Sequence, residues 1–303
     1  MTGVLGAVKA HLPARQLNRL RTLRSSFREF GNSVFAVDKS AFTDAIAELG
    51  LGRGDVVYVR SSYDDMGTIR ATPLELIQLL CDVVSEDGTI MMPTYPTNGL
   101  TYPYLVENPN FHWRRTPSMS GLVTEVFRRM KGTKRSLHPT HSVAVWGKLA
   151  DDLARGHENA EAPFDESSPY QKLLPIGAKL LSIGRFDTPM PLRHLADDLI
   201  QDRIPFSIYC DAPVEVTLVG PDKKVIQRKM RTHRPGVKSN QRAVASRMER
   251  EGLVKRSRAG RVPMTLVSLE SFLRVYEECA AEGVLEFRLE AAPPDAVQGA
   301  SRS

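Results

Sequence analysis

Short apolar segments that alternate with helix signals constrain the fold of this chain most strongly. Two of them, residues 54–60 (GDVVYVR) and 89–95 (TIMMPTY), have the length and composition of buried strands. Between them, residues 72–75 (TPLE) form a capping box with proline at the first helical position, which predicts a helix that runs to about residue 85. A further strand is expected at residues 178–184 (AKLLSIG). The alternation predicts an α/β fold with a mostly parallel central sheet, whose ligands bind beyond the carboxyl ends of the strands.

The composition is that of an ordinary globular protein. Of the 303 residues, 42% are hydrophobic and 25% are charged, which is enough to bury a sizeable core. No apolar run approaches the roughly 20 residues needed to cross a bilayer, and residues 1–6 are too short for the apolar core of a signal peptide. We therefore expect a cytoplasmic protein. Its three cysteines, Cys81, Cys210 and Cys279, lie far apart without metal-ligand spacing, so we expect reduced, structural thiols.

Changes in composition divide the chain into four regions. Residues 1–37 form a basic N-terminal helical segment with apolar residues near helical spacing, which predicts a docked helix and leaves peripheral membrane contact as the alternative. The α/β core is expected over residues 38–210. Residues 211–285 contain a hairpin pattern and two helix patterns, typical of a smaller C-terminal α+β subdomain. The tail, residues 286–303, is rich in small residues and proline and is expected to be disordered.

The net charge of +6 is unevenly distributed, because basic residues are concentrated between positions 223 and 261. Such a stretch can attract nucleic acid, an anionic membrane or a phosphorylated ligand. No aromatic stacking set is interleaved with the charges, and no nucleic-acid-binding module is recognisable. The pattern therefore favours a solvated basic face over a nucleic-acid partner.

Polar groups that could take part in chemistry are concentrated in two segments, residues 135–147 (RSLHPTHSVAVWG) and 182–198 (SIGRFDTPMPLRHLADD). Both segments border apolar runs, so we expect these groups at the ends of strands or helices, facing a cleft. The candidates are His138, His141, Ser142 and His194.

One of the histidines has the sequence context of a general base. On the helix predicted around His194, Asp197 lies three residues later and Asp198 four residues later, so either carboxylate can share its face. A carboxylate beside a histidine fixes the tautomer and stabilises the imidazolium.

Other kinds of chemistry have weaker support. His138 and His141 could bind a metal together with His194, but there is no HExxH motif and no cysteine pair. We therefore expect no metal. Ser61, Ser62 and Ser142 are conceivable nucleophiles, but none lies in a GxSxG motif, and no glycine-rich phosphate loop is present.

Taken in order, several segments resemble the aminoglycoside 3-N-acetyltransferase family. These segments are GDVVYVRSSYDDMG, DGTIMMPTY, RTPSMSGLVTEVFRRMKGTKRSLHPTHSVAVWG, SSPYQKLLPIGAKLLSIG, RHLADD and EREGLVKRSRAG. The resemblance covers roughly residues 38–280. It implies an αβα sandwich and the transfer of an acetyl group from acetyl-CoA to an amine, by direct attack on the thioester.

The resemblance also implies roles for individual residues. It assigns His194 as the general base and places Asp197 where the family has a glutamate. His138 and Ser142 border the active centre and would shape and polarise it, whereas His141 loses its claim to catalysis. Acetyl-CoA would bind along the residues that match the CoA groove of the family: Ser61, Ser62, Gly67 and Ser118.

Several positions depart from the family pattern on the acceptor side. Asp64 and Asp65 replace residues that are usually small or apolar, and Pro191 and Arg193 stand where the family usually has a hydroxyl and an apolar residue. The acidic pair could bind a polycationic aminoglycoside, whereas an arginine beside the base suits an anionic acceptor such as an amino sugar nucleotide.

The sequence thus predicts an N-acetyltransferase that acts on the amine of a small molecule, an amino sugar with aminoglycosides among the candidates. A homo-oligomer is compatible with it. The alternative is a non-catalytic CoA or nucleotide-sugar binding homologue that has lost its acceptor geometry.

Overall fold

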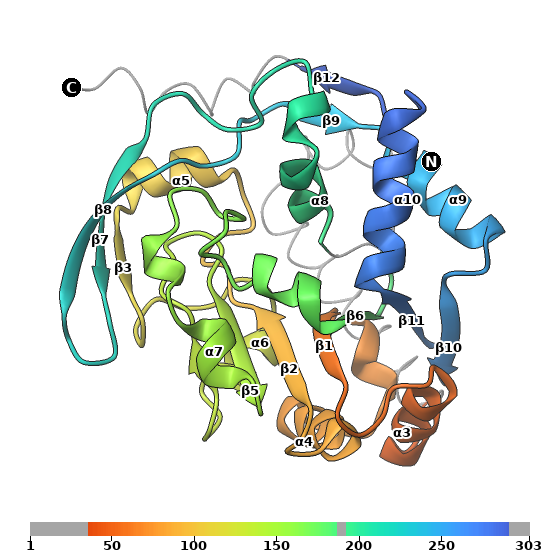
Figure 1. The fold of residues 1–303 in the computed structure, drawn as a ribbon. Coiled ribbons are helices and arrows are strands. Elements are labelled where there is room, and N and C mark those ends of the chain that lie inside the picture. Colours follow the sequence, from red (N-terminus) through yellow and green to blue (C-terminus); the bar gives the residue numbers. More distant parts are fainter. Residues whose placement is uncertain (1–35, 187–191, 291–303) are drawn as a thin grey trace, which may run out of the picture.

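The computed structural model describes residues 36–186 and 192–290, and its largest element is a seven-stranded sheet (Figure 1). In chain order its strands are β1 (Val56–Ser61), β2 (Thr89–Pro93), β4 (Lys134–Arg135), β5 (Val143–Gly147), β6 (Lys179–Ile183), β10 (Lys255–Ala259) and β11 (Val262–Ser268). Across the sheet they follow the order β10-β11-β6-β1-β2-β5-β4.

The centre of this sheet is parallel. β1 pairs in parallel with β2 on one side and with β6 on the other. Outside this core, β5 runs antiparallel to β2, and β11 runs antiparallel to β6. The edge strands β4 and β10 reverse direction again. Five of the seven strands therefore run in one direction, which confirms the predicted α/β fold with a mostly parallel sheet.

Helices cover both faces of the sheet. They are α3 (Lys39–Glu48), α4 (Pro73–Val84), α5 (Thr101–Glu107), α6 (Leu122–Phe127), α7 (Ala150–Ala154), α8 (Arg193–Leu199), α9 (Gln241–Arg250) and α10 (Leu269–Ala281), with short 3-10 helices at Asp65–Thr68, His157–Asn159, Gln171–Ile176 and Gln201–Arg203. Buried side chains of α3, α4 and α6 pack with Val57 and Val59 of β1, whereas those of α7, α8 and α10 pack with Tyr58. Successive side chains of a strand point to opposite faces, so β1 joins two cores of an αβα sandwich, as predicted.

The start of α4 has the predicted capping box. The Thr72 side chain accepts a hydrogen bond from the Glu75 backbone N–H, and the Glu75 carboxylate accepts one from the Thr72 N–H. Two backbone donors that the helix itself leaves unpaired are thereby satisfied, which stabilises such a helix by about 1 kcal/mol. The cap therefore fixes the first residue of the helix that connects β1 to β2.

Two small sheets accompany the central one. The first contains β3 (Asn110–His112), β7 (Val214–Val219) and β8 (Val225–Met230), and Figure 1 shows it at the left edge of the view. The predicted hairpin is the antiparallel β7–β8 pair. The second sheet pairs β9 (Val237–Ser239) with β12 (Phe287–Leu289). Residues 211–285 therefore contribute to both small sheets and, through β10 and β11, to the central sheet. The domain boundaries stay a prediction.

The chain ends are described only in part. Strand β12 lies inside the tail predicted to be disordered, so that prediction is wrong for this strand. Residues 291–303 lie outside the described residues, as does the basic N-terminal segment up to residue 35. Within the described ranges, no helix is long and apolar enough to cross a membrane. The three cysteines are free thiols, and Cys81 and Cys279 are buried.

Part of the basic stretch 223–261 is neutralised by acidic side chains. Arg247 of α9 forms ion pairs with Glu251, Glu278 and Glu282, and two of these carboxylates lie on or just after α10. Exposed pairs of this kind contribute little stability each, but they cancel charge locally. The pairing favours the predicted solvated face.

Gly147, at the end of β5, allows the sheet to close tightly around β2. Its φ is +106°, and a Cβ atom there would lie 2.2 Å from the Gly88 carbonyl oxygen. We expect Gly147→Ala to lower the free energy of unfolding in urea by about 2 kcal/mol or more, because the clash is with backbone and the φ is unfavourable for alanine. The matched control is Gly52→Ala, where a Cβ meets nothing within 4 Å. An equal effect of both substitutions would contradict this account.

Candidate active site

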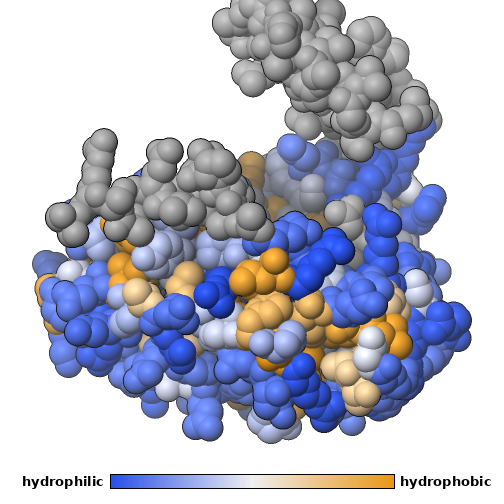
Figure 2. Space-filling view, turned by 90° about the horizontal axis from the view of Figure 1, so that it is seen from above, coloured by the Kyte–Doolittle hydropathy of each residue, from blue (hydrophilic) through white to orange (hydrophobic). Residues whose placement is uncertain are grey.

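The parallel core brings the ends of β1 and β6 to one edge of the sheet. The backbone N–H of Ser62 donates to the Ile183 carbonyl at 2.9 Å, which joins the two strand ends. The start of α6 reaches the same edge, since a Cβ on Gly121 would lie 3.9 Å from the Ser61 carbonyl oxygen. Figure 2, which views the molecule from above Figure 1, shows apolar residues among hydrophilic ones on that face. The predicted serine pair therefore lies at a rim of the kind where α/β folds bind ligands.

Helix α8 presents His194 together with a buried carboxylate. The His194 Nδ1 lies 3.3 Å from Asp197 Oδ2, and the side chain of His194 is 42% exposed whereas that of Asp197 is 4% exposed. The hydroxyl of Tyr276, on α10, donates to Asp197 Oδ1, and Gln241 Nε2 donates to that hydroxyl at 2.8 Å. Burial and the Asp197 charge raise the pKa of Tyr276, so the tyrosine keeps its proton. The carboxylate is thereby fixed on one side by α10 and orients the imidazole on the other.

Arg193 contacts the other nitrogen of the same imidazole. Its Nη2 lies 2.9 Å from His194 Nε2, and its Nε lies 4.0 Å from Asp197 Oδ2. A guanidinium has donors only, so Nε2 accepts this hydrogen bond and Nδ1 carries the proton that faces the carboxylate. This is the neutral tautomer that a general base needs.

The second candidate carboxylate is directed elsewhere. Asp198 Oδ1 accepts a hydrogen bond of 2.6 Å from the Tyr209 hydroxyl. Burial raises the pKa of Asp198, and the hydrogen bond from Tyr209 opposes that shift. Of the two carboxylates that the sequence left open, Asp197 is the partner of His194.

Five histidine rings form a continuous row that ends at His194. Ring centroids lie 4.5 Å apart for His194 and His233, 5.4 Å for His233 and His141, 6.0 Å for His141 and His138, and 4.4 Å for His138 and His157. Burial lowers the pKa of His138 and of His141, and it lowers the pKa of His157 to about 3. The interior end of the row is therefore neutral, and only His194 and His233 are partly exposed.

His138 and Ser142, predicted to border the active centre, both lie inside the protein. His138 is 1% exposed, and its Nδ1 accepts hydrogen bonds from the backbone N–H groups of Thr140 and His141. The Ser142 hydroxyl is fully buried and donates to the Thr94 carbonyl at 2.8 Å. These contacts indicate a positioning role: Ser142 holds the backbone just after β2, and His138 holds the backbone of its own turn and belongs to the histidine row.

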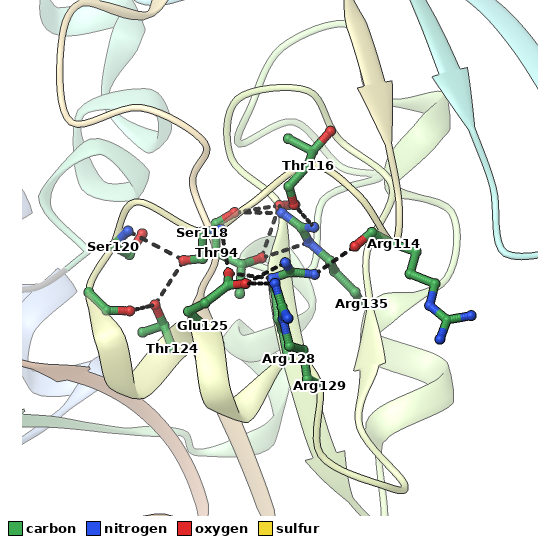
Figure 3. A network of polar contacts seen from close by, with 12 residues as sticks. Thr94, Arg114, Thr116, Ser118, Ser120, Thr124, Glu125, Arg128, Arg129 and Arg135 are labelled. Atoms are coloured by element: carbon green, nitrogen blue, oxygen red, sulfur yellow. Dashed lines mark hydrogen bonds and ion pairs between the residues drawn. The ribbon is translucent and has the colours of Figure 1, made fainter. Parts of the chain in front are cut away.

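The buried guanidinium of Arg135 holds several loops at this end of the sheet (Figure 3). It donates to the carbonyl oxygens of Thr94, Trp113 and Thr116 at 2.9, 2.9 and 2.6 Å, and to the hydroxyl of Ser142 at 3.2 Å. Burial, and then the charge of Arg128, lower its pKa to about 9. The sequence patterns did not single out this residue, although it lies in the segment that holds His138.

Ser118 belongs to the adjoining part of the network in Figure 3. Its N–H donates to Glu125 Oε2 at 2.7 Å, and its hydroxyl bonds that of Thr124 at 2.8 Å. Burial would raise the pKa of Glu125, but hydrogen bonds from Arg128 and from the Ser118 N–H lower it to about 2. Helix α6 begins at Leu122, so Ser118 does not cap it directly and instead anchors the preceding loop through Glu125.

The two acidic residues after β1, Asp64 and Asp65, differ in their surroundings. Asp65 Oδ2 accepts a hydrogen bond of 2.8 Å from the Arg185 backbone N–H, and a Cβ on Gly184 would lie 2.9 Å from the same oxygen. Asp65 therefore joins the loop after β1 to the loop after β6. Asp64 and Gly67 are exposed at this loop. Pro191 lies outside the described residues.

No group of three or more histidine, cysteine or acidic side chains within residues 36–186 and 192–290 is arranged to hold a metal ion. An exposed imidazole oriented by a buried carboxylate, as His194 is by Asp197 and Tyr276, is an arrangement that can transfer a proton.

The neutral histidines predict a particular acid sensitivity. An unfolded histidine has a pKa near 6.5, so between about pH 6.5 and pH 3 the unfolded chain binds a proton that folded His157 does not. The free energy of unfolding therefore falls as the pH falls, by up to about 1.4 kcal/mol per pH unit for each such histidine. His157→Gln should reduce this slope in urea titrations between pH 6 and 4 by about that amount. His112→Gln, outside the row, is the control; an unchanged slope for His157→Gln would refute the interpretation.

The chain is similar to known proteins over most of its length. A family model described as aminoglycoside 3-N-acetyltransferase matches residues 58–280. The SPbeta prophage-derived aminoglycoside N(3')-acetyltransferase-like protein YokD of Bacillus subtilis (strain 168) is 30% identical over 183 residues, which cover 55% of this chain and 66% of that protein. Aminoglycoside N(3)-acetyltransferase IX of Micromonospora chalcea is 27% identical over 197 residues, which cover 59% of this chain and 68% of that protein.

A solved structure of AAC-IIIb with CoASH superimposes with a TM-score of 0.69 at 21% identity, and the match covers 85% of this chain and 99% of that one. At that identity the likeness shows the shared fold. The family model spans far more than half of the chain, and it confirms the resemblance seen in the sequence. This chain belongs to the aminoglycoside 3-N-acetyltransferase family.

Proposed function

We propose that the chain transfers an acetyl group from acetyl-CoA to the amine of a small molecule, with His194 as the general base. The observation that carries this proposal is the line from His194 through Asp197 to Tyr276, with a partly exposed imidazole at one end and a buried, hydrogen-bonded carboxylate behind it. Family membership supports the reaction class. A reaction that consumes acetyl-CoA also fits the expected cytoplasmic localisation.

The proposed chemistry is a direct displacement. The amine nitrogen attacks the carbonyl carbon of the thioester, the C–N bond forms, the C–S bond breaks, and His194 Nε2 takes the proton that the amine loses. The imidazolium then delivers the proton to the CoA thiolate. Asp197 stabilises the imidazolium, and Tyr276 holds the carboxylate in place. Binding both reactants in one orientation supplies the rest of the catalysis.

For acetyl-CoA we propose the rim around Ser61, Ser62 and Gly67, with Ser118 holding the adjacent loop. One exposed apolar side chain lies nearby: Phe186 packs against Arg60, the residue before Ser61, and is 37% exposed. Mixed apolar and polar surface suits the pantetheine arm, which is a chain of methylenes and amides. The CoASH bound to AAC-IIIb, which shares this fold, supports the choice of co-substrate.

For the acceptor we propose an amino sugar, with aminoglycosides among the candidates because the relatives are named for them. Asp64 is the exposed member of the acidic pair, so it is the better candidate to bind a cationic substrate. The competing proposal is a homologue that binds CoA or a nucleotide sugar without turnover.

The first test of the proposal is His194→Ala. With acetyl-CoA and an acceptor that the unaltered protein acetylates, chosen from aminoglycosides and nucleotide-linked amino sugars, kcat/KM should fall by at least about 100-fold, the scale of general-base catalysis. Thiol release measures turnover, and calorimetry should show acetyl-CoA binding within about twofold of the unaltered protein. Near-full activity would rule out His194 as the base. Tight acetyl-CoA binding without turnover by any acceptor would favour the non-catalytic alternative.

The second test separates the two candidate carboxylates. Tyr276→Phe removes the hydroxyl that donates to Asp197, and should lower kcat about tenfold with little change in KM, because Asp197 then orients His194 less well. Tyr209→Phe removes the matching hydroxyl from Asp198 and should leave kcat within about twofold. A larger loss in Tyr209→Phe would transfer the orienting role to Asp198.

A further inference from the structure

The nitrogen that must accept the proton of the amine already has a partner. His194 Nε2 accepts a hydrogen bond of 2.9 Å from Arg193 Nη2. Its other nitrogen, Nδ1, faces Asp197, so Nε2 carries the only lone pair in the ring plane that can act as a base. An acceptor amine can reach this lone pair only when Arg193 moves away from it.

Arg193 is held loosely enough to move. Its side chain is 35% exposed, and its ion pair with Asp197 is long, at 4.0 Å. That carboxylate is shared with the Tyr276 hydroxyl and with His194. The carboxylate that faces the arginine is therefore already engaged by other groups.

A second guanidinium lies on a neighbouring element. Arg231, just after β8, lies over the Tyr209 ring at 5.5 Å. His233 packs on His194 at 4.5 Å and adds no charge, because burial and then His194, His141 and Arg193 lower its pKa. An anion that approached Arg193 would therefore meet an exposed guanidinium beside a neutral ring.

We infer that Arg193 determines the acceptor class: it favours amines that carry a phosphate or carboxylate within roughly 6 Å of the nitrogen, the span that two adjoining hydrogen bonds allow. The inference rests on the proposed function and narrows its acceptor from amino sugars in general, aminoglycosides included, to anionic amines. The anion takes the guanidinium donors in charge-assisted hydrogen bonds, which are about twice as strong as hydrogen bonds between neutral groups. Arg193 leaves Nε2 as the amine arrives, so one substrate both frees the base and is oriented by the arginine. A polycationic acceptor offers no such exchange.

The test compares acceptors that differ in one anionic group: glucosamine, glucosamine 1-phosphate and glucosaminic acid. We expect the unaltered protein to prefer an anionic member over glucosamine by at least about tenfold in kcat/KM. Arg193→Gln should remove most of that preference, by lowering kcat/KM for the anionic amine and raising it for glucosamine. The matched control is Arg203→Gln, which deletes an exposed charge paired with Glu277 and should keep the preference. Comparison of glucosamine 1-phosphate with glucosaminic acid shows whether a phosphate or a carboxylate is preferred.

An unaltered preference in Arg193→Gln, or preferential acetylation of uncharged or polycationic amines by the unaltered protein, would overturn the inference. Absence of turnover with every acceptor would count against the proposed function, so a second experiment tests the contact without catalysis. Diethyl pyrocarbonate modifies an imidazole through its free lone pair, and mass spectrometry locates the modified histidine.

In that experiment His194 should be modified at least about fivefold faster in Arg193→Gln than in the unaltered protein or in Arg203→Gln, because its Nε2 lone pair is then exposed. Inorganic phosphate should accelerate modification of His194 in the unaltered protein, by drawing Arg193 away, and should have no such effect in Arg193→Gln. Equal rates in all three proteins, with and without phosphate, would overturn the inference.

Discussion

The proposed chemistry depends on the buried carboxylate of Asp197. A carboxylate removed from water is costly unless donors surround it, and here three groups from two helices do so: His194 and Arg193 on α8, and Tyr276 on α10. Because α10 packs on the central sheet through the same core as β1, the position of His194 is tied to the packing of the C-terminal third of the chain.

Much of the scaffold could be predicted because its signals are local. The capping box marks the start of α4, and the spacing of His194 and Asp197 along the chain is enough to place them on one helical face. Tyr276 could not be predicted, because it lies 79 residues after Asp197 and meets it only through packing. The addition of β10 and β11 to the central sheet could not be predicted for the same reason, since strand order depends on contacts between residues far apart in the sequence.

The burial of side chains is a second property that the sequence could not predict at this site. His138 and Ser142 lie beside an apolar run, and nothing local reveals whether such residues face a cleft or the interior. The structure places both in the interior, where their hydrogen bonds fix the backbone and Arg135 joins three carbonyl oxygens. Neutral histidines then continue from this interior to His194. The short polar segment around His138 thus shapes the site indirectly, because its hydrogen bonds fix the backbone and the loops around it.

Arg193 and Asp197 affect His194 together, because both contact its imidazole and lie close to each other. With Arg193 in place, the Asp197 carboxylate is divided between a cation 4.0 Å away and the imidazole 3.3 Å away. When an anion draws the arginine outward, the carboxylate loses a competing cation, and more of its charge stabilises the imidazolium that forms as the amine is deprotonated. The same movement frees Nε2 and strengthens the support behind it. An anionic acceptor would therefore lower the barrier to proton transfer as well as bind, which is how binding energy becomes catalysis.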